Sequence, residues 1–207
     1  VYDYGLTVHD EAWHAIAEDT GTERRLSALS RLRDGRVVGM MAATVNVDTC
    51  QIVFNIRPRD GNHLAVWKGA RRLRDFSGTE LAVSSILPAL LVTEDPDDGA
   101  LLKRGKVYVT PNPSRRFERA RAVYGYFEVY NLTPDEHGTT SYETSYTIRK
   151  IGQTALQKVL AIFGRQDRPE TAVTVERLGE TPTANEYVAL DLRRAGRGAF
   201  RLEVTVR

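Results

Sequence analysis

The chain is poor in the residues that staple small secreted domains or carry common catalytic chemistry. Its 207 residues include a single cysteine, Cys50, so no intrachain disulfide can form. The four histidines and scattered serines form no recognisable triad, phosphate loop or metal-ligand motif. No apolar run approaches the roughly 20 residues of a membrane span. The sequence therefore excludes a disulfide-stapled module and predicts no transmembrane segment, no metal and no cofactor.

An excess of charge of one sign is also lacking. The 29 basic and 27 acidic residues are interspersed and give a net charge of +2, which is typical of a solvated surface. A nucleic-acid-binding protein would gather its basic residues on one face or in one tract, and this sequence does not. We therefore predict no nucleic-acid partner.

Alternating, β-type sequence is abundant. Strand-like segments recur at roughly ten-residue spacing, with turn signals such as Asp34–Gly35 between them. The predicted strands are 1–9, 24–32, 37–47, 51–57, 63–68, 80–86, 107–110, 172–178, 186–192 and 199–206. Residues 10–19 and 154–163 have a helical period instead. The pattern predicts a mainly β fold of two tandem antiparallel β-sandwich domains, immunoglobulin-like, with one or two short connecting helices.

An acidic segment rich in structure breakers divides this pattern. Residues 93–99 (Thr-Glu-Asp-Pro-Asp-Asp-Gly) are typical of an inter-domain linker or a long exposed loop. We expect one β-sandwich domain over residues 1–98 and a second over residues 106–207. Because the chain begins and stops within alternating sequence, we also expect it to be a fragment of a longer protein.

The most unusual feature is a tyrosine-rich segment. Residues 121–132 and 138–149 both alternate and are separated by a polar turn, which predicts a long β-hairpin. Alternation places four residues of its first strand on one core face, namely Val123, Gly125, Phe127 and Val129. The opposite face carries Tyr124, Tyr126, Glu128 and Tyr130. The second strand has an apolar face with Tyr142, Thr144, Tyr146 and Ile148.

The first of these strands has no plainly wet face, so we expect another element to cover its tyrosines. A neighbouring domain or helix would suit the amphipathic tyrosine ring. The alternatives are a protein partner, or a carbohydrate whose sugar faces stack on the rings while Glu128 binds hydroxyls. The binding candidates are Tyr124, Tyr126, Glu128 and Tyr130, together with Arg116 from a nearby arginine cluster.

Other polar groups point to no chemistry. His9 and His14 flank Asp10 at a junction that does not guarantee a shared face, so we predict no metal site there. The carboxylates of residues 94–98 lack the spacing of a calcium-binding loop. Cys50 lies among apolar residues with no nearby cation, which favours a packed thiol. We predict no catalytic residue, and hence a protein that is not an enzyme.

Several segments resemble a known family. They are Leu73–Ile86, Val107–Phe117, Tyr126–Leu132, Tyr142–Tyr146, Ala189–Leu192 and Gly198–Val206. Over about residues 50–207 the chain resembles the C-terminal β-rich region of bacterial GWxTD-domain proteins. The Gly-Trp-x-Thr-Asp signature itself is absent and would lie in an N-terminal domain outside this chain. The resemblance implies an exported protein, periplasmic or associated with the cell envelope, and supplies no catalytic or ligand position.

These observations together lead to two hypotheses for function. The first is a non-catalytic structural or protein-binding β-sandwich region of an exported bacterial protein, whose partner is another protein or the missing N-terminal domain. The alternative is a carbohydrate-binding module that uses the face of Tyr124, Tyr126 and Tyr130.

Overall fold

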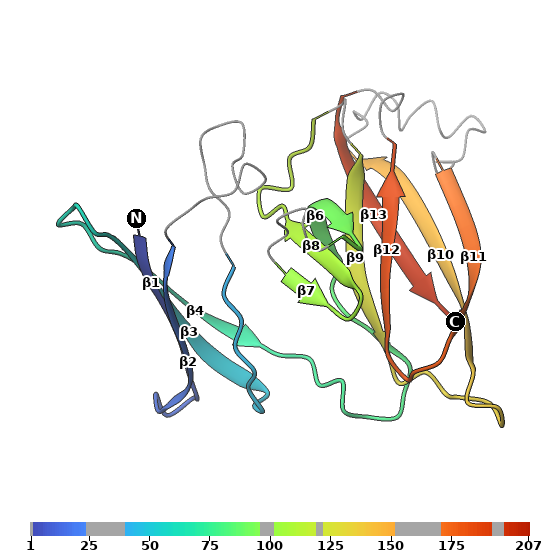
Figure 1. Cartoon of the computed structure of the whole chain (residues 1–207), viewed down its shortest axis with the longest axis horizontal. Coiled ribbons are helices and arrows are strands. Elements are labelled where there is room, and N and C mark those ends of the chain that lie inside the picture. Colours follow the sequence, from blue (N-terminus) through green and yellow to red (C-terminus); the bar gives the residue numbers. More distant parts are fainter. Residues whose placement is uncertain (1, 24–39, 96–101, 119–121, 152–170, 192–196) are drawn as a thin grey trace, which may run out of the picture.

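A computed structural model of the chain describes residues 2–23, 40–95, 102–118, 122–151, 171–191 and 197–207 (Figure 1). These residues form antiparallel β-sheets and contain no helix. The predicted mainly β fold is confirmed. No membrane-crossing helix, judged by length and apolar character, occurs in the described part of the chain.

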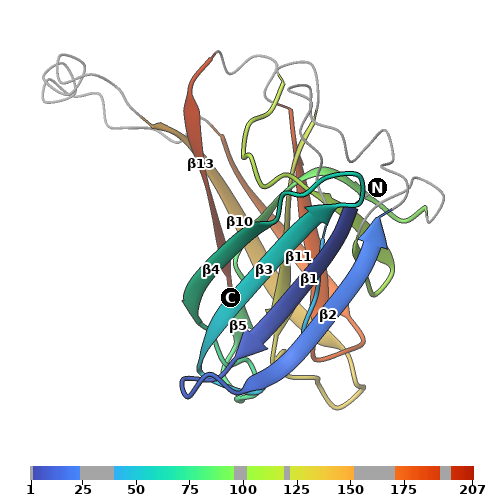
Figure 2. The ribbon, with the colours of Figure 1, turned by 90° about the vertical axis from the view of Figure 1, so that its left-hand side faces the viewer.

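The first four strands make one sheet, in the order β2-β1-β3-β4. Their bounds are Tyr2–His9 for β1, Ala15–Glu23 for β2, Thr49–Pro58 for β3 and Ala65–Arg72 for β4. Figure 2 shows this sheet nearly face on, with β4 and β2 at its two edges. The register aligns Leu6 with Phe54 and Phe54 with Trp67, so alternation gives the sheet one strongly apolar face.

The helix predicted over residues 10–19 is wrong. The chain reverses at a tight turn, in which the Asp10 amide donates to the His14 carbonyl (3.0 Å) and Trp13 adopts a positive φ of 64°. Residues 15–23 then pair with β1. An isolated helix of ten residues is marginal in water, whereas pairing with β1 satisfies the backbone groups of the whole segment.

The remaining strands form two facing sheets (Figure 1). The six-stranded sheet has the order β12-β9-β6-β8-β7, with β5 also paired to β9. Its strands are β5 (Ala82–Val83), β6 (Leu87–Thr93), β7 (Leu102–Arg104), β8 (Val107–Pro111), β9 (Val123–Tyr130) and β12 (Ala184–Leu190). The three-stranded sheet has the order β11-β10-β13. Its strands are β10 (Thr140–Ile151), β11 (Thr171–Gly179) and β13 (Ala199–Val206).

The predicted tyrosine hairpin is also wrong. β9 pairs with β12, β6 and β5, whereas β10 pairs with β11 and β13, so residues 131–139 cross from one sheet to the other. The two strands face each other through the core, where the rings of Phe127 and Tyr146 meet edge to face at 6.2 Å. Facing sheets bury the apolar sides of both strands against each other, which pairing side by side would not do.

The face assignments within these two strands are confirmed. Phe127 and Val129 are fully buried, and Tyr142 and Tyr146 lie in the same apolar cluster. Which face a side chain lies on depends only on alternation within its own strand, so the assignment is correct even though the predicted pairing of the two strands is wrong.

The strands on either side of residues 94–101 belong to one sheet. β6 ends at Thr93 and β7 begins at Leu102, and each of them pairs with β8. β5 and β6 also pair with β9, so residues 82–93 join a sheet made mostly of later strands. The division into domains at residues 1–98 and 106–207 stays a prediction, as does an immunoglobulin-like topology.

Four further predictions concern the segments around these strands. Residues 40–47, at the end of the predicted strand 37–47, form no strand. The predicted strand 24–32, the turn at Asp34–Gly35 and the predicted helix 154–163 lie outside the described residues.

Candidate functional site

The candidate site lies on the face of β9 opposite the sandwich core. Here the six-stranded sheet curls, so that its two ends approach each other. Arg104 Nε at the end of β7 lies 3.2 Å from Glu128 Oε1 on β9. A Cβ on Gly105, whose φ is 55°, would lie 2.6 Å from Asn185 Nδ2 on β12. The turn from β7 to β8 therefore closes over the tyrosine face.

Hydrogen bonds converge on Glu128 in this curl. Tyr126 Oη lies 2.7 Å from Glu128 Oε1 and 2.8 Å from Asn185 Oδ1, so one hydroxyl proton is shared between two acceptors. Tyr130 Oη donates to Glu128 Oε2. With the cation of Arg104 beside it, Glu128 has partners on both oxygens. We call these five residues the tyrosine–glutamate cluster.

Burial and the carboxylate keep both hydroxyls protonated. Tyr126 is only 4% exposed, and burial, followed by the bond to Glu128, raises the pKa of Tyr126 far above its usual value. The same two causes raise the pKa of Tyr130 to about 12. At neutral pH both tyrosines therefore keep their hydroxyl protons and donate hydrogen bonds to Glu128.

The tyrosine rings are covered by other parts of the chain. Tyr126 packs in an apolar cluster from β6, β7 and β8, whose other buried members are Ala89, Val92, Leu102, Val107 and Val109. Tyr124 is partly buried against that cluster. The ring of Tyr130 stacks on Phe76, with centroids 4.4 Å apart and planes 23° from parallel. We expected from the sequence that another element covers these tyrosines, and that element is the curled sheet itself together with Phe76.

The structure brings four of the five predicted binding residues together. Tyr124, Tyr126, Glu128 and Tyr130 share the outer face of β9. Arg116 lies instead in an exposed turn after β8, where its carbonyl accepts a bond from Asn112 Nδ2 (2.9 Å).

Sequence reasoning missed two members of the cluster, Arg104 and Asn185. Both come from strands distant from β9 in sequence, and nothing in their local sequence distinguishes them. Their role follows from the curl of the sheet, which no local pattern encodes.

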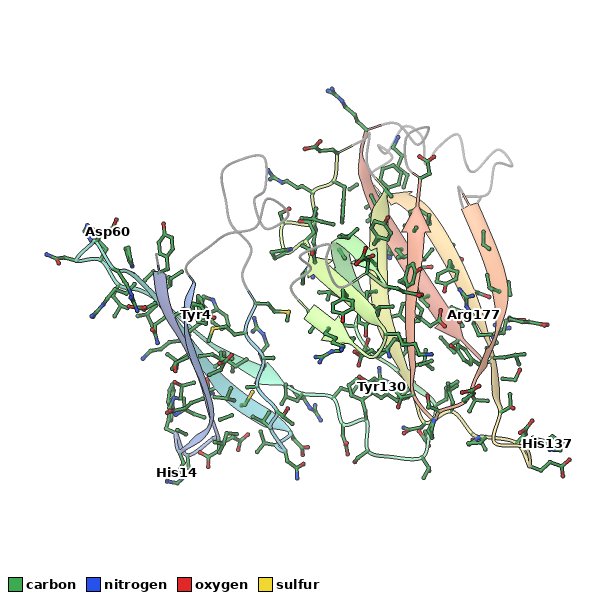
Figure 3. All side chains as sticks on the ribbon, in the orientation of Figure 1. Tyr4, His14, Asp60, Tyr130, His137 and Arg177 are labelled. Carbon is green, nitrogen blue, oxygen red and sulfur yellow. The ribbon has the colours of Figure 1, made fainter. Side chains whose placement is uncertain are left out.

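A second, similar cluster was also missed. Glu186 of β12 is opposite Phe127 in the register and therefore points between the two sheets, where it is 8% exposed. Tyr142 Oη donates to Glu186 Oε1 (2.6 Å), and Arg177 Nε lies 3.3 Å from Glu186 Oε2. Burial, and then the bond to Glu186, raises the pKa of Tyr142. Figure 3 shows Tyr130 near the lower end of β9 and Arg177 on β11 beyond β12, at the other cluster.

The second cluster had a signal in the sequence. Glu186 occupies an otherwise apolar stripe of Ala184, Val188 and Leu190 along β12. A carboxylate at such a position needs a buried partner. The sequence alone could have flagged Glu186, although not its partners.

The histidine-containing turn has a local structural role. His14 Nδ1 lies 3.2 Å from Asp10 Oδ2, and His9 Nδ1 lies 3.2 Å from the Trp13 carbonyl. Among the residues that the structure describes, no group of three or more histidine, cysteine or acidic side chains could hold a metal ion. Cys50 is buried at one end of the apolar face of the first sheet.

No family model, curated protein or solved structure matches this chain. The resemblance to GWxTD-domain proteins therefore stays a prediction from the sequence.

Proposed function

We propose that this chain is a non-catalytic structural or protein-binding β-sandwich region of an exported bacterial protein. The observation that carries the proposal is that the polar groups of the tyrosine–glutamate cluster bond to one another. The Glu128 carboxylate is occupied by two hydroxyls and a guanidinium. Polar groups used in this way hold strands in place. The export of the protein and its bacterial origin are supported by the sequence resemblance alone.

The cluster has a clear mechanical consequence. Arg104 at the end of β7 and Asn185 on β12 belong to strands at opposite ends of the sheet order, and both contact residues of β9. Their contacts close the sheet around the apolar cluster that contains Tyr126. A sheet fastened in this way is a rigid scaffold, which suits a region that presents surfaces to other proteins.

The first sheet supports the protein-binding part of the proposal. Several large apolar side chains on it or at its turns are exposed, including Trp13 (52%), Val66 (51%) and Trp67 (45%). Aromatic residues are enriched in protein interfaces relative to other surfaces. We therefore place the partner-binding surface on the four-stranded sheet.

The carbohydrate-binding alternative has less support from this geometry. A sugar stacks on an open aromatic face, whereas Tyr126 is buried and Tyr130 is already stacked on Phe76. Tyr124 alone of the three keeps part of its ring exposed without a hydroxyl bond to Glu128. A platform for a glycan would require the curl to open.

Hydrogen exchange tests the scaffold role. Tyr126→Phe removes the shared hydroxyl and keeps the ring, so we expect faster amide exchange in β7, β8 and β9 and no change in the four-stranded sheet. Tyr187→Phe, at an exposed position of β12, is the matched control. Unchanged exchange in Tyr126→Phe would contradict the scaffold role. Saturable binding of a neutral oligosaccharide that shifts the ring resonances of Tyr124, Tyr126 and Tyr130 would establish the alternative.

A further inference from the structure

The two edges of the four-stranded sheet carry opposite charge. The charged residues of β2 whose side chains the structure describes are both acidic, namely Glu18 and Asp19. Those of β4 are all basic, namely Lys68, Arg71 and Arg72. Neither strand pairs along its outer edge with another described strand, and Figure 2 shows both at the flanks of the sheet. We call β2 the acidic edge and β4 the basic edge.

We propose that the acidic edge of one copy of the chain pairs with the basic edge of a second copy and so extends the sheet. The proposal rests on the partner-binding role proposed above and names the partner. An open edge presents a row of unpaired backbone groups, which is a ready template for another strand. The two edges have similar lengths of nine and eight residues.

The direction of the strands suits this junction. Each neighbouring pair in the order β2-β1-β3-β4 is antiparallel, so β2 and β4 run in opposite directions. A second copy placed with its β2 beside β4 therefore adds another antiparallel pair. The apolar face stays on the same side of the extended sheet, because the second copy is not flipped relative to the first.

One register between β2 of one copy and β4 of the other places two pairs of opposite charges side by side. Asp19 and Arg71 lie on the apolar face, because they align through the register with Leu6 and Cys50. Glu18 and Arg72 lie on the other face. Setting Asp19 opposite Arg71 automatically sets Glu18 opposite Arg72, so each face of the junction gains one pair of opposite charges. Such cross-strand pairs stabilise a sheet, and like charges in the same place destabilise it.

The same register brings two glycines together. Gly21 on the acidic edge lies under the ring of Tyr4, where a Cβ would be 2.5 Å from the hydroxyl oxygen. Gly69 on the basic edge lies under the ring of Trp67, where a Cβ would be 2.6 Å from the indole. In the proposed register these glycines are opposite each other. The two rings would therefore meet across the junction and bury apolar surface that is exposed in one copy.

Charge also selects against the other pairings. Two acidic edges or two basic edges would repel, so only the head-to-tail contact remains. A contact of this kind repeats from copy to copy and gives rings or open chains, not a closed two-fold dimer. Basic residues on an edge usually prevent association, and here the acidic edge of the next copy would neutralise them.

Sedimentation velocity of the full chain provides the test. We expect the average mass to rise with protein concentration and to fall at high salt, which screens exposed charges. In the variant Lys68→Glu/Arg71→Glu/Arg72→Glu, both β2 and β4 carry acidic residues. In the variant Glu18→Lys/Asp19→Lys, lysines replace the acidic pair on β2, and β4 stays basic. Each should be monomeric alone. Mixing them should restore association, because each then offers the edge that the other lacks.

Two controls make the outcome decisive. Arg201→Glu reverses an exposed charge on β13 and should associate like the wild type. Circular dichroism shows whether each variant keeps its sheet content. A wild-type chain that is monomeric at all concentrations, or variants that associate alone as strongly as the wild type, would overturn the proposal. Neither result bears on the proposed scaffold role, which is tested separately by hydrogen exchange in the six-stranded sheet.

Discussion

Glu128→Gln removes the charge at the centre of the tyrosine–glutamate cluster and keeps its shape. The Glu128 side chain is 17% exposed, and it accepts bonds from Tyr126 and Tyr130. A hydrogen bond to a charged group contributes roughly 1.5–3 kcal/mol. The ion pair adds less than about 1 kcal/mol, because the Arg104 side chain is 48% exposed and solvent screens it.

The amide cannot replace the carboxylate fully. One of its two positions is a donor, so either Tyr126 or Tyr130 can no longer donate its hydroxyl proton to this side chain. We expect Glu128→Gln to lower the free energy of unfolding of the sandwich by about 2–3 kcal/mol at pH 7, the sum of one weakened charged bond and one lost bond. Urea melts measure this loss.

A double-mutant cycle with Tyr126→Phe isolates the shared bond. Because both substitutions affect the same bond, the double variant should lose about 1 kcal/mol less than the sum of the two single variants. Glu176→Gln, at an exposed carboxylate on β11, is the matched control and should stay within about 0.5 kcal/mol of the wild type. Additive losses, or a Glu128→Gln variant as stable as the control, would refute the interpretation of the cluster as a fastener.

Three further outcomes are expected. Phe127→Ala should lower the free energy of unfolding by about 3–5 kcal/mol in urea melts, since the ring is fully buried. Gly125→Ala should cost about 1–3 kcal/mol and lower Tm in calorimetry, because its Cβ would lie 2.8 Å from Leu202 Cδ2 inside the sandwich. Stability should fall as pH rises from about 10 to about 12, since Tyr130 ionises near 10 when unfolded and keeps its proton to about 12 when folded; ultraviolet titration should show it ionising late.

The faces of the strands could be predicted from the sequence because alternation is local. Phe127 and Tyr146 were assigned to apolar faces from the two-residue period alone, and both are buried. Which strands pair is decided by contacts far apart in the chain. Loop length gave no warning, because the turn between the two alternating segments (133–137) has five residues, a length that hairpin loops commonly have; only the structure shows that the connection is 131–139.

The error over residues 10–19 has a different origin. The spacing of Trp13, Ile16 and Ala17 fits a helix, but a short helical pattern competes with strand pairing whenever a suitable strand lies next to it. β1 is that neighbour, and residues 15–23 pair along its length. Sequence period is a weak guide for segments too short to form a helix unaided.

The two clusters explain what fixes the position of β12 on β9. A slip of two residues would keep the apolar alternation of β12 intact, so packing alone leaves that register weakly specified. The observed register places Asn185 beside Tyr126 on one face and Glu186 beside Tyr142 on the other. A slip would break both contacts and leave a buried carboxylate without a partner, which is far more costly than a lost methyl contact. The buried polar groups of this chain therefore select one register among several that its apolar residues would accept.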